Sequence, residues 1–271
     1  MRDSSIANES PDNLLSVATE AARAAGDILR TYAKTGFRIT HKNPIDLVTD
    51  ADHAAEQCII EHIRARFPNH RILAEERGPD TLPPSHYRWV IDPLDGTTNF
   101  AHGYPVYAIS IGVEYEGRGL IGIVYDPIRD ELFAAQASGG ARLNGQPIAV
   151  SSTEQLDQAL LVTGFAYDIR DSQNNNLNHF ARFALKAQGL RRTGSAALDL
   201  CYVAAGRFDG FWEVKLSPWD MAAGVVILRE AGGTVTDFKG ETHSIYQPEL
   251  VASNGWVHEA MLAILHDDFS R

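Results

Sequence analysis

Two carboxylates stand three positions apart at the end of an apolar segment. They lie in the run Trp89-Val90-Ile91-Asp92-Pro93-Leu94-Asp95-Gly96-Thr97-Thr98-Asn99-Phe100. Hard divalent cations prefer carboxylate oxygens, and phosphate prefers the exposed N–H groups of a helix start, which Gly96-Thr97-Thr98 would supply. The run therefore indicates a metal and a phosphate held together. A surface turn in which Asp95 caps the next segment explains the same residues about equally well.

Other acids favour the functional interpretation, although each has a structural alternative. Glu75-Glu76 follow the apolar segment 71–74, and Asp220 follows Trp219 where a helix is expected to begin. A carboxylate in a first helical turn is typical of a cap, and Thr49 with Asp52 resembles a capping box. Glu213 stands among aromatic and apolar residues, where a carboxylate is expected to be paired or functional.

The absence of other motifs narrows the chemistry. The ten histidines show no H-E-x-x-H spacing, and the chain has no C-x-x-C pair, no ATP-binding G-x-x-x-x-G-K-[ST] loop and no G-x-S-x-G elbow. Several carboxylates without soft ligands favour Mg²⁺, which can activate a water and stabilise a leaving oxygen.

Periodicity predicts the elements that must position these acids in the first half. A helix over 14–32 is capped by Asp12 or Asn13 and ends at Gly36, and a second runs from Thr49 to Phe67-Pro68. A turn is expected at 43–44. Glycine-containing loops at 116–119 and 144–145 indicate hairpins, so these helices are expected to pack on a largely antiparallel sheet. The expected strands are 71–74, 88–91, 106–115, 120–125 and 131–135.

The second half alternates strands with helices, which predicts an α/β layer. Strands are expected over 159–165, 208–214, 234–237 and 250–252, and helices over 178–188, 195–205, 219–231 and 257–266. The polar stretch 151–158 is the candidate boundary. We therefore expect a frayed segment 1–12, an α+β half over 13–152 and an α/β half over 153–271, the two halves forming one compact unit.

Composition excludes several classes of protein. The 24 basic and 35 acidic residues of the 271-residue chain leave a net charge of −11, which argues against a binder of duplex nucleic acid. A hydrophobic fraction of 44% and a charged fraction of 22% are those of a globular protein, without a run long enough to span a membrane. A polar N-terminus and only two cysteines predict a reducing, cytoplasmic setting.

Taken together, the motifs resemble those of the inositol monophosphatase family over nearly the whole chain. The run from Asp92 to Phe100 matches the first family signature, and Trp219-Asp220-Met221-Ala222-Ala223-Gly224 with Glu230-Ala231-Gly232-Gly233 matches the second. Arg192-Thr193-Gly194-Ser195-Ala196-Ala197 resembles the substrate loop, and the segments 46–52 and 74–76 match two earlier blocks. The resemblance implies a layered α-β-α-β-α sandwich, a homodimer, two or three Mg²⁺ per site and sensitivity to lithium.

The same resemblance implies a role for each matching residue. The Mg²⁺ ligands would be Glu75, Asp92, the Leu94 carbonyl, Asp95 and Asp220. Asp52 and Thr97, with Glu75, would orient and deprotonate the attacking water. The phosphate and the alcohol would be contacted by Asp95, Gly96, Thr97, Gly194, Ser195, Ala196, Glu213 and Asp220.

The expected activity is Mg²⁺-dependent hydrolysis of inositol-1-phosphate, a small phosphorylated polyol. Histidinol phosphate, fructose-1,6-bisphosphate and nucleoside bisphosphates remain alternative substrates, because only contacts with the alcohol distinguish them. Glu213 would serve the hydroxyls of inositol or the amine of histidinol equally. A regulatory role in which the same fold binds a protein partner is the alternative of another class, and neither direct nucleic-acid binding nor membrane association is expected. A two-carboxylate glycosidase ranks far below, since it leaves the N–H groups of 96–98 unexplained.

Overall fold

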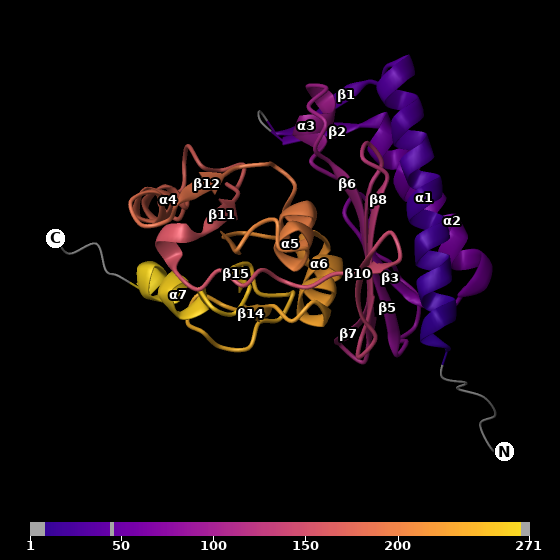
Figure 1. The fold of residues 1–271 in the computed structure, drawn as a ribbon. Helices are drawn as coiled ribbons and strands as arrows, with labels where there is room; N and C mark the ends of the chain where they lie inside the picture. Colours follow the sequence, from indigo (N-terminus) through magenta and orange to yellow (C-terminus); the bar gives the residue numbers. More distant parts are fainter. Residues whose placement is uncertain (1–8, 44–45, 267–271) are drawn as a thin grey trace.

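The chain folds into five alternating layers of helices and sheets (Figure 1). The structure is a computed structural model that describes residues 9–43 and 46–266. Its helices are α1 (Pro11–Thr35), α2 (Asp50–Arg66), α3 (Thr97–Ala101), α4 (Leu177–Ala184), α5 (Ala196–Ala204), α6 (Pro218–Glu230) and α7 (His258–His266), with a 3₁₀ turn at Leu156–Gln158. The sequence of layers is α1 and α2, a large sheet, α5 and α6, a smaller sheet, and α4 with α7, which confirms the expected α-β-α-β-α sandwich.

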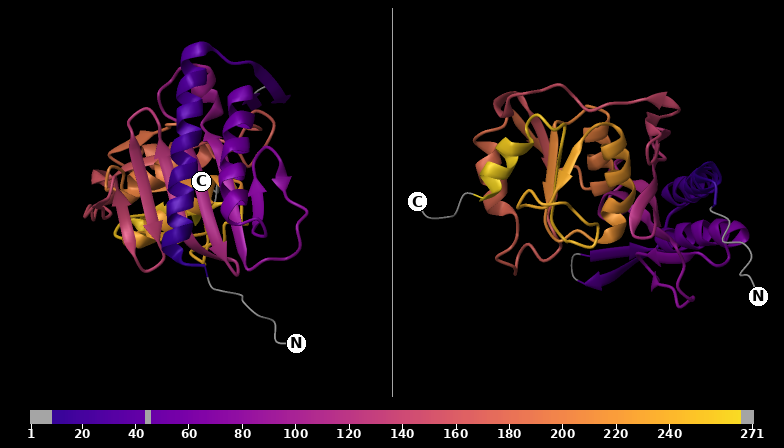
Figure 2. Two further views of the ribbon diagram at one scale, coloured as in Figure 1. Left: turned by 90° about the vertical axis from the view of Figure 1, so that its right-hand side faces the viewer. Right: turned by 90° about the horizontal axis from the view of Figure 1, so that it is seen from below.

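The larger sheet belongs to the first half of the chain. Among the described residues it has eight strands in the order β10-β9-β8-β7-β6-β5-β3-β4, antiparallel except where β3 runs parallel to β5. The strands are β3 (Arg71–Ala74), β4 (Gly78–Pro79), β5 (Tyr87–Asp95), β6 (Ala108–Tyr115), β7 (Arg118–Asp126), β8 (Glu131–Gln136), β9 (Gly140–Leu143) and β10 (Gln146–Pro147). Helices α1 and α2 bury one face of this sheet (Figure 2, left). The expected antiparallel character and both hairpins are confirmed.

The smaller sheet mixes parallel and antiparallel pairs. Within the described part of the chain its order is β12-β11-β13-β15-β14, and β11 runs parallel to both of its neighbours. Its strands are β11 (Leu160–Thr163), β12 (Gly189–Arg191), β13 (Gly210–Glu213), β14 (Thr234–Thr236) and β15 (Leu250–Ser253). A separate ribbon pairs β1 (Ile39–Asn43) with β2 (Asp46–Thr49) beside α3.

Helix α6 lies unusually close to the large sheet because two strand residues facing it are glycines. A Cβ added at Gly122 would lie 2.3 Å from the carbonyl oxygen of Ala223, and one at Gly112 would lie 2.6 Å from the Cβ of Ala222. Such distances are impossible for real Cβ atoms, so both positions require glycine. This close packing brings the first turn of α6 next to the end of β5, where the site forms.

Several expected boundaries are wrong. Helix α1 begins at Pro11 behind Ser10, so residues 11–12 are helical rather than frayed, and neither Asp12 nor Asn13 is the cap. Proline at the first helical position is favourable because its missing N–H needs no partner there. The expected fraying of 1–8 and the Pro44 half of the expected turn lie outside the described residues.

In the second half, α4 ends at Ala184 instead of continuing to residue 188. The short strand β12 follows it, and its pairing partner β11 lies far upstream in the sequence. Strand β2 also has no counterpart among the expected elements. Within residues 9–43 and 46–266, no helix is both long and apolar enough to cross a lipid bilayer.

The burial of His70 predicts that the protein loses stability at acid pH. His70 stacks between Phe67 and Tyr87, and its Nδ1 accepts a hydrogen bond of 3.1 Å from Nε1 of Trp89. Burial, with the nearby charge of Arg64, lowers the pKa of His70 from 6.5 to about 4. The folded protein therefore holds the imidazole neutral, whereas the unfolded chain protonates it below pH 6.5.

Because of His70, we expect the free energy of unfolding to decrease as the pH falls from 6.5 to 4, by about 3 kcal/mol over the full interval. The measurement is Tm between pH 7 and pH 4 for the wild type and His70→Phe, whose curve should be flatter. The exposed His53, changed to Asn, is the control. Parallel curves for wild type and His70→Phe would contradict the assignment.

Candidate metal and phosphate site

The acids at the end of β5 line a cavity with acids from three other segments. This metal-side cavity has a volume of about 340 Å³. It is lined by Asp46, Glu75, Asp92, Leu94, Asp95, Gly96, Thr97, Tyr167, Lys215, Ser217, Trp219 and Asp220. All five residues expected to ligate metal therefore meet in one place, although they come from β5, the segment after β3, and the first turn of α6.

The sheet register explains why Asp92 and Asp220 meet. Asp92 pairs with Ser110 of β6, and the register between β5 and β6 shifts between Asp92 and Asp95, around Pro93. Ser110 Oγ donates a 3.2 Å hydrogen bond to the carbonyl of Trp219, immediately before Asp220. Ser217 N in turn donates to Asp220 Oδ2 at 2.7 Å. Asp220 is thus both the third residue of α6, whose side chain completes the capping box with Ser217, and a wall of the cavity.

Burial raises the pKa values of these carboxylates, and neighbouring acids add to the rise at Asp92 and Asp220. Burial, followed by the charges of Glu75, Asp95 and Asp220, raises the pKa of Asp92 well above its ordinary value. Burial raises the pKa of Asp95 to about 6. The pKa of Asp220 is also raised, by burial and then by Asp95. A buried group of like charges in one cavity is stabilised by a bound cation.

Asp95 joins the two halves of the molecule. Its Oδ2 accepts hydrogen bonds from Ser195 Oγ at 2.5 Å and from Ala197 N at 2.8 Å. Asp95 therefore caps α5, a hundred residues downstream, and does not cap the segment that follows it. The surface-turn interpretation is wrong, because Asp92 and Asp95 are both buried.

Asp52 reaches the cavity through Thr97. Its Oδ2 accepts bonds from Thr49 N at 2.9 Å and Thr49 Oγ1 at 2.5 Å, which confirms the capping box at the start of α2. Its other oxygen, Oδ1, lies 3.1 Å from Thr97 Oγ1. Asp52 is fully buried and Thr97 lines the cavity, so a proton can pass between them. Burial raises the pKa of Asp52, and its bonds with Thr49 and Thr97 oppose that rise.

A second, alcohol-side cavity of about 170 Å³ adjoins the first. The two share Asp95, Gly96, Tyr167, Lys215 and Asp220. Five further residues expected from the family resemblance or from the substrate loop line it: Arg192, Gly194, Ser195, Ala196 and Glu213. The expected metal and substrate residues therefore occupy two adjoining spaces.

Glu213 lies deep in the alcohol-side cavity. Burial, and then the charge of Asp199, raises the pKa of Glu213 to about 8. A Cβ at Gly164 would lie 2.3 Å from each oxygen of this carboxylate, so the glycine leaves the space that Glu213 occupies. A carboxyl group with this pKa can accept or donate hydrogen bonds near neutral pH, which suits contact with hydroxyl groups.

The donor set fits Mg²⁺. Carboxylate and carbonyl oxygens surround the metal-side cavity, and the lining side chains include neither histidine nor cysteine. In the part of the chain that the structure describes, no three His, Cys, Asp or Glu side chains are already arranged to hold one ion. The acids therefore share a cavity, and their side chains would have to move closer together to bind an ion.

Sequence reasoning missed several residues of the site. Asp199 lines the alcohol-side cavity and accepts a 2.5 Å bond from Thr193 Oγ1, and its pKa is raised well above the ordinary value by burial. The sequence did offer one signal for Asp199, which is its position between Leu198 and Leu200 in an expected helix. Asn99 Nδ2 donates to the carbonyls of Val106 at 2.7 Å and Thr193 at 2.9 Å, which ties the substrate loop to α3. Lys215 and Tyr167 carried no motif.

Comparison with known proteins agrees with this geometry. Residues 10–268 match the model of the inositol monophosphatase family. The chain is 48% identical to an inositol-1-monophosphatase from Synechocystis, over 93% of this chain and 89% of that protein. It is 44% identical to the Nus factor SuhB of Escherichia coli, over 95% and 97% of the two chains.

A solved structure extends the similarity to three dimensions. The inositol monophosphatase from Anabaena superimposes with a TM-score of 0.86 at 46% identity, covering 94% of this chain and 95% of that one. The chain therefore belongs to the inositol monophosphatase family.

Proposed function

We propose that the chain is a Mg²⁺-dependent phosphomonoesterase that hydrolyses inositol-1-phosphate to inositol and phosphate. The observation that carries the proposal is the pair of adjoining cavities, one walled by buried carboxylates and the other by the substrate loop and Glu213. Two or three Mg²⁺ would be held by Glu75, Asp92, the Leu94 carbonyl, Asp95 and Asp220. Bound there, the ions would supply charge for the phosphoryl group and its leaving oxygen.

The protein's own residues account for the proton transfer. Thr97 Oγ1 lies 3.1 Å from both Asp52 Oδ1 and the carbonyl of Leu94, and its single proton can be donated to only one of them. When the proton points to Asp52, the oxygen of Thr97 can accept a hydrogen bond from a water in the cavity. That water's proton then passes to Thr97 as Thr97 releases its own to Asp52.

The alcohol-side contacts decide among substrates. Ser195 and Ala197 hold the Asp95 carboxylate, and Gly194, Ala196 and Glu213 complete a wall to which Glu213 contributes a carboxyl group. This wall suits a polyol, whose hydroxyls can bond to Glu213 in either protonation state. Histidinol phosphate is the alternative that uses the same residue, through its amine.

The assay is phosphate release by the purified protein, with Mg²⁺ or with EDTA. Its substrates are inositol-1-phosphate, histidinol phosphate and fructose-1,6-bisphosphate, and Asp95→Asn is the inactive control. Turnover that requires Mg²⁺, is greatest on inositol-1-phosphate and is lost in the variant is the expected result. Inhibition by lithium would agree with the family resemblance. A protein that turns over none of these substrates contradicts the proposal.

Mg²⁺ is expected to raise Tm, more at pH 8 than at pH 5. The pKa of Asp95 is raised to about 6, so without metal its contribution to stability falls as the pH rises through about 4 to 6. A bound cation offsets the cost of the buried charge, whereas a proton removes that charge at low pH. Differential scanning fluorimetry with Mg²⁺, and with Na⁺ at matched ionic strength, measures the effect. Equal shifts from the two salts would argue against an intact metal site.

A second candidate function follows from one relative. A protein 44% identical over 95% of this chain is named a Nus factor, which favours a role in which this fold also binds a protein partner. A partner that purifies equally with wild type and Asp95→Asn would support binding that does not depend on catalysis. The same preparation, examined by light scattering, tests the homodimer that we propose from the family resemblance.

A further inference from the structure

Glu75 lies in a turn and not in a strand. Residues 75–77 join β3 to β4, and the ladder between these strands ends at the pair Ala74 and Gly78. Glu75 N donates a 3.1 Å hydrogen bond to the carbonyl of Ile91 in β5, which fixes the residue on the side of the large sheet. Glu75 also lines the metal-side cavity. The direction of its side chain therefore depends on what holds the rest of the turn.

A buried glutamate of α2 holds this turn. Glu56 Oε2 accepts a 2.9 Å hydrogen bond from Glu76 N, and Glu56 Oε1 lies 3.3 Å from Nε of Arg77. The side chain of Glu56 is 1% exposed, whereas that of Arg77 is 54% exposed. An ion pair with so exposed a partner contributes little, and a buried carboxylate is costly unless it is hydrogen-bonded. The bond from Glu76 N is therefore the main interaction that this carboxylate makes.

The helix that carries Glu56 also carries Asp52. The two acids are four residues apart and both are buried, so they lie on one face of α2. Asp52 Oδ1 lies 3.1 Å from Thr97 Oγ1, while Glu56 holds the turn. One helical face thus fixes the residue proposed to accept the proton and the turn that presents Glu75. Glu56 itself lines neither cavity, so it can act on the site only through the turn.

We infer that Glu56 is a positioning residue for the metal: by holding Glu76 N it keeps the Glu75 carboxylate directed at the metal-side cavity and so raises the affinity for Mg²⁺. The inference rests on the proposed function, which makes Glu75 a ligand. Groups that hold a metal ligand in place typically contribute about 10- to 100-fold to metal affinity. Without this bond the cation would have to order the turn as it binds.

The test is calorimetric titration of Mg²⁺ into the purified protein without substrate. Glu56→Met fills the same space but offers Glu76 N no oxygen, and the Kd for Mg²⁺ should rise by at least about tenfold. Glu56→Gln keeps an oxygen that can accept the bond, so its Kd should stay within about threefold of the wild-type value. The two variants lose the same charge and differ in the acceptor.

Glu56→Asp makes the opposite comparison. It keeps the charge but is one methylene shorter, so its oxygens do not reach Glu76 N, and the Kd for Mg²⁺ should again rise by about tenfold. This variant also serves if Glu56→Met does not fold. Equal weakening in Glu56→Met and Glu56→Gln, with wild-type affinity in Glu56→Asp, would mean that only the charge matters. That result, or a Kd unchanged in all three, overturns the inference.

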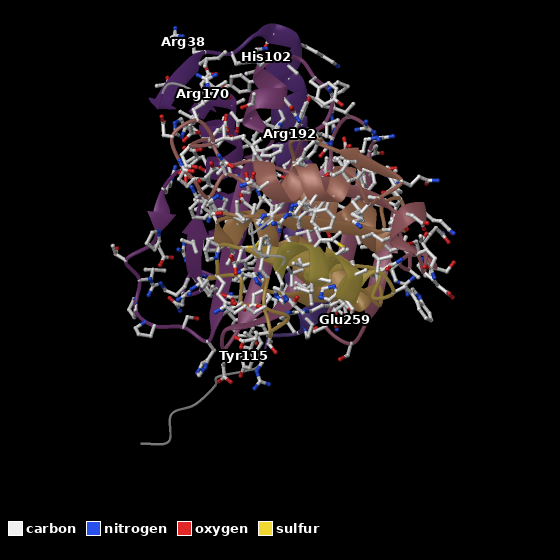
Figure 3. All side chains as sticks on the ribbon, turned by 90° about the vertical axis from the view of Figure 1, so that its left-hand side faces the viewer. Arg38, His102, Tyr115, Arg170, Arg192 and Glu259 are labelled. Atoms are coloured by element: carbon white, nitrogen blue, oxygen red, sulfur yellow. The ribbon has the colours of Figure 1, made fainter. Side chains whose placement is uncertain are left out.

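Glu259→Met is the matched control. Glu259, labelled in Figure 3, is an exposed residue of α7, in the outer layer on the opposite side of the molecule from α2, and it lines neither cavity. Its replacement should leave the Kd for Mg²⁺ unchanged. A rise equal to that of Glu56→Met would show a general effect of lost negative charge and would overturn the inference.

Kinetics separate positioning from a general loss of structure. With inositol-1-phosphate, Glu56→Met should need about tenfold more Mg²⁺ for half-maximal activity, while KM at saturating Mg²⁺ changes by less than about twofold. A rise in KM as large as the shift in Mg²⁺ requirement would overturn the inference. If wild type binds Mg²⁺ but hydrolyses no substrate, the proposed function fails and the Kd values still decide the role of Glu56. If wild type binds no Mg²⁺, both fail.

Discussion

Asp92→Asn is expected to abolish turnover and, at the same time, to stabilise the metal-free protein. Asp92 is 2% exposed, and burial followed by three neighbouring carboxylates raises its pKa well above the ordinary value. Once the pH exceeds the ordinary value of 3.8, ionisation of this carboxyl favours the unfolded chain, where the charge is hydrated. Asparagine has the same shape without the charge, so the repulsion disappears together with the metal ligand.

The expected effects are large and opposite in sign. kcat/KM should fall by about 10³-fold or more, because the site loses a charge that it uses to hold the cation and position the phosphate. In EDTA at pH 8, Tm should rise by about 2 °C, the shift expected for about 1 kcal/mol in a chain of this size. Phosphate release and scanning fluorimetry on the same preparations measure both.

The control is Asp157→Asn, which makes the same chemical change at an exposed aspartate that lines neither cavity. It should alter neither activity nor Tm. If the Asp92→Asn protein were active, Asp92 would not be a residue on which the site depends. An inactive variant whose Tm in EDTA is unchanged would show instead that the metal-free acids do not repel one another as their burial implies.

The second large effect is expected at the pair Asp52 and Thr97. Asp52→Asn should lower kcat by about 10²- to 10⁴-fold with little change in KM, the range for loss of a general base. The asparagine oxygen can still accept from Thr49 N, so α2 keeps its cap and Tm should change little. Its amide would then face Thr97 and cannot accept a proton.

A double-mutant cycle separates proton transfer from simple packing. If Asp52 acts through Thr97, then Thr97→Ala and the double variant should each lose about as much kcat as Asp52→Asn, so the losses are not additive. Thr97→Ser keeps the hydroxyl and is the matched control, with most of the activity retained. Additive losses, or an active Thr97→Ala protein, would contradict the relay.

Local structure was predictable wherever one periodicity dominated. The apolar spacing from Leu14 to Tyr32 indicates α1, and the glycine loops at 116–119 and 144–145 indicate two hairpins that the structure contains. The three-residue strand β12 was not predictable, because its pairing with β11 lies outside its local sequence. Short parallel strands have no turn signal of their own, so only the packed sheet identifies them.

For the functional site, too, some residues could be predicted from the sequence and others only from the fold. Its motifs named Asp92, Asp95, Asp220 and Glu213, and the structure places all four around the two cavities. The local pattern misassigned the partner of Asp95, since the groups that it caps are in α5. Asp199 and Lys215 carried no motif, because their relevance depends on which surface each side chain faces after folding.

The sequence by itself determined the chemistry of the donors: several carboxylates, few soft ligands, and glycine where backbone must approach backbone. Only the tertiary structure decided which of these groups share a cavity. Asp220 reaches Asp92 because Gly112 and Gly122 let α6 lie against the large sheet, and Asp52 reaches the cavity through Thr97. Residue types fix what a side chain can bind, whereas distances between remote segments arise only when the sheets and helices pack.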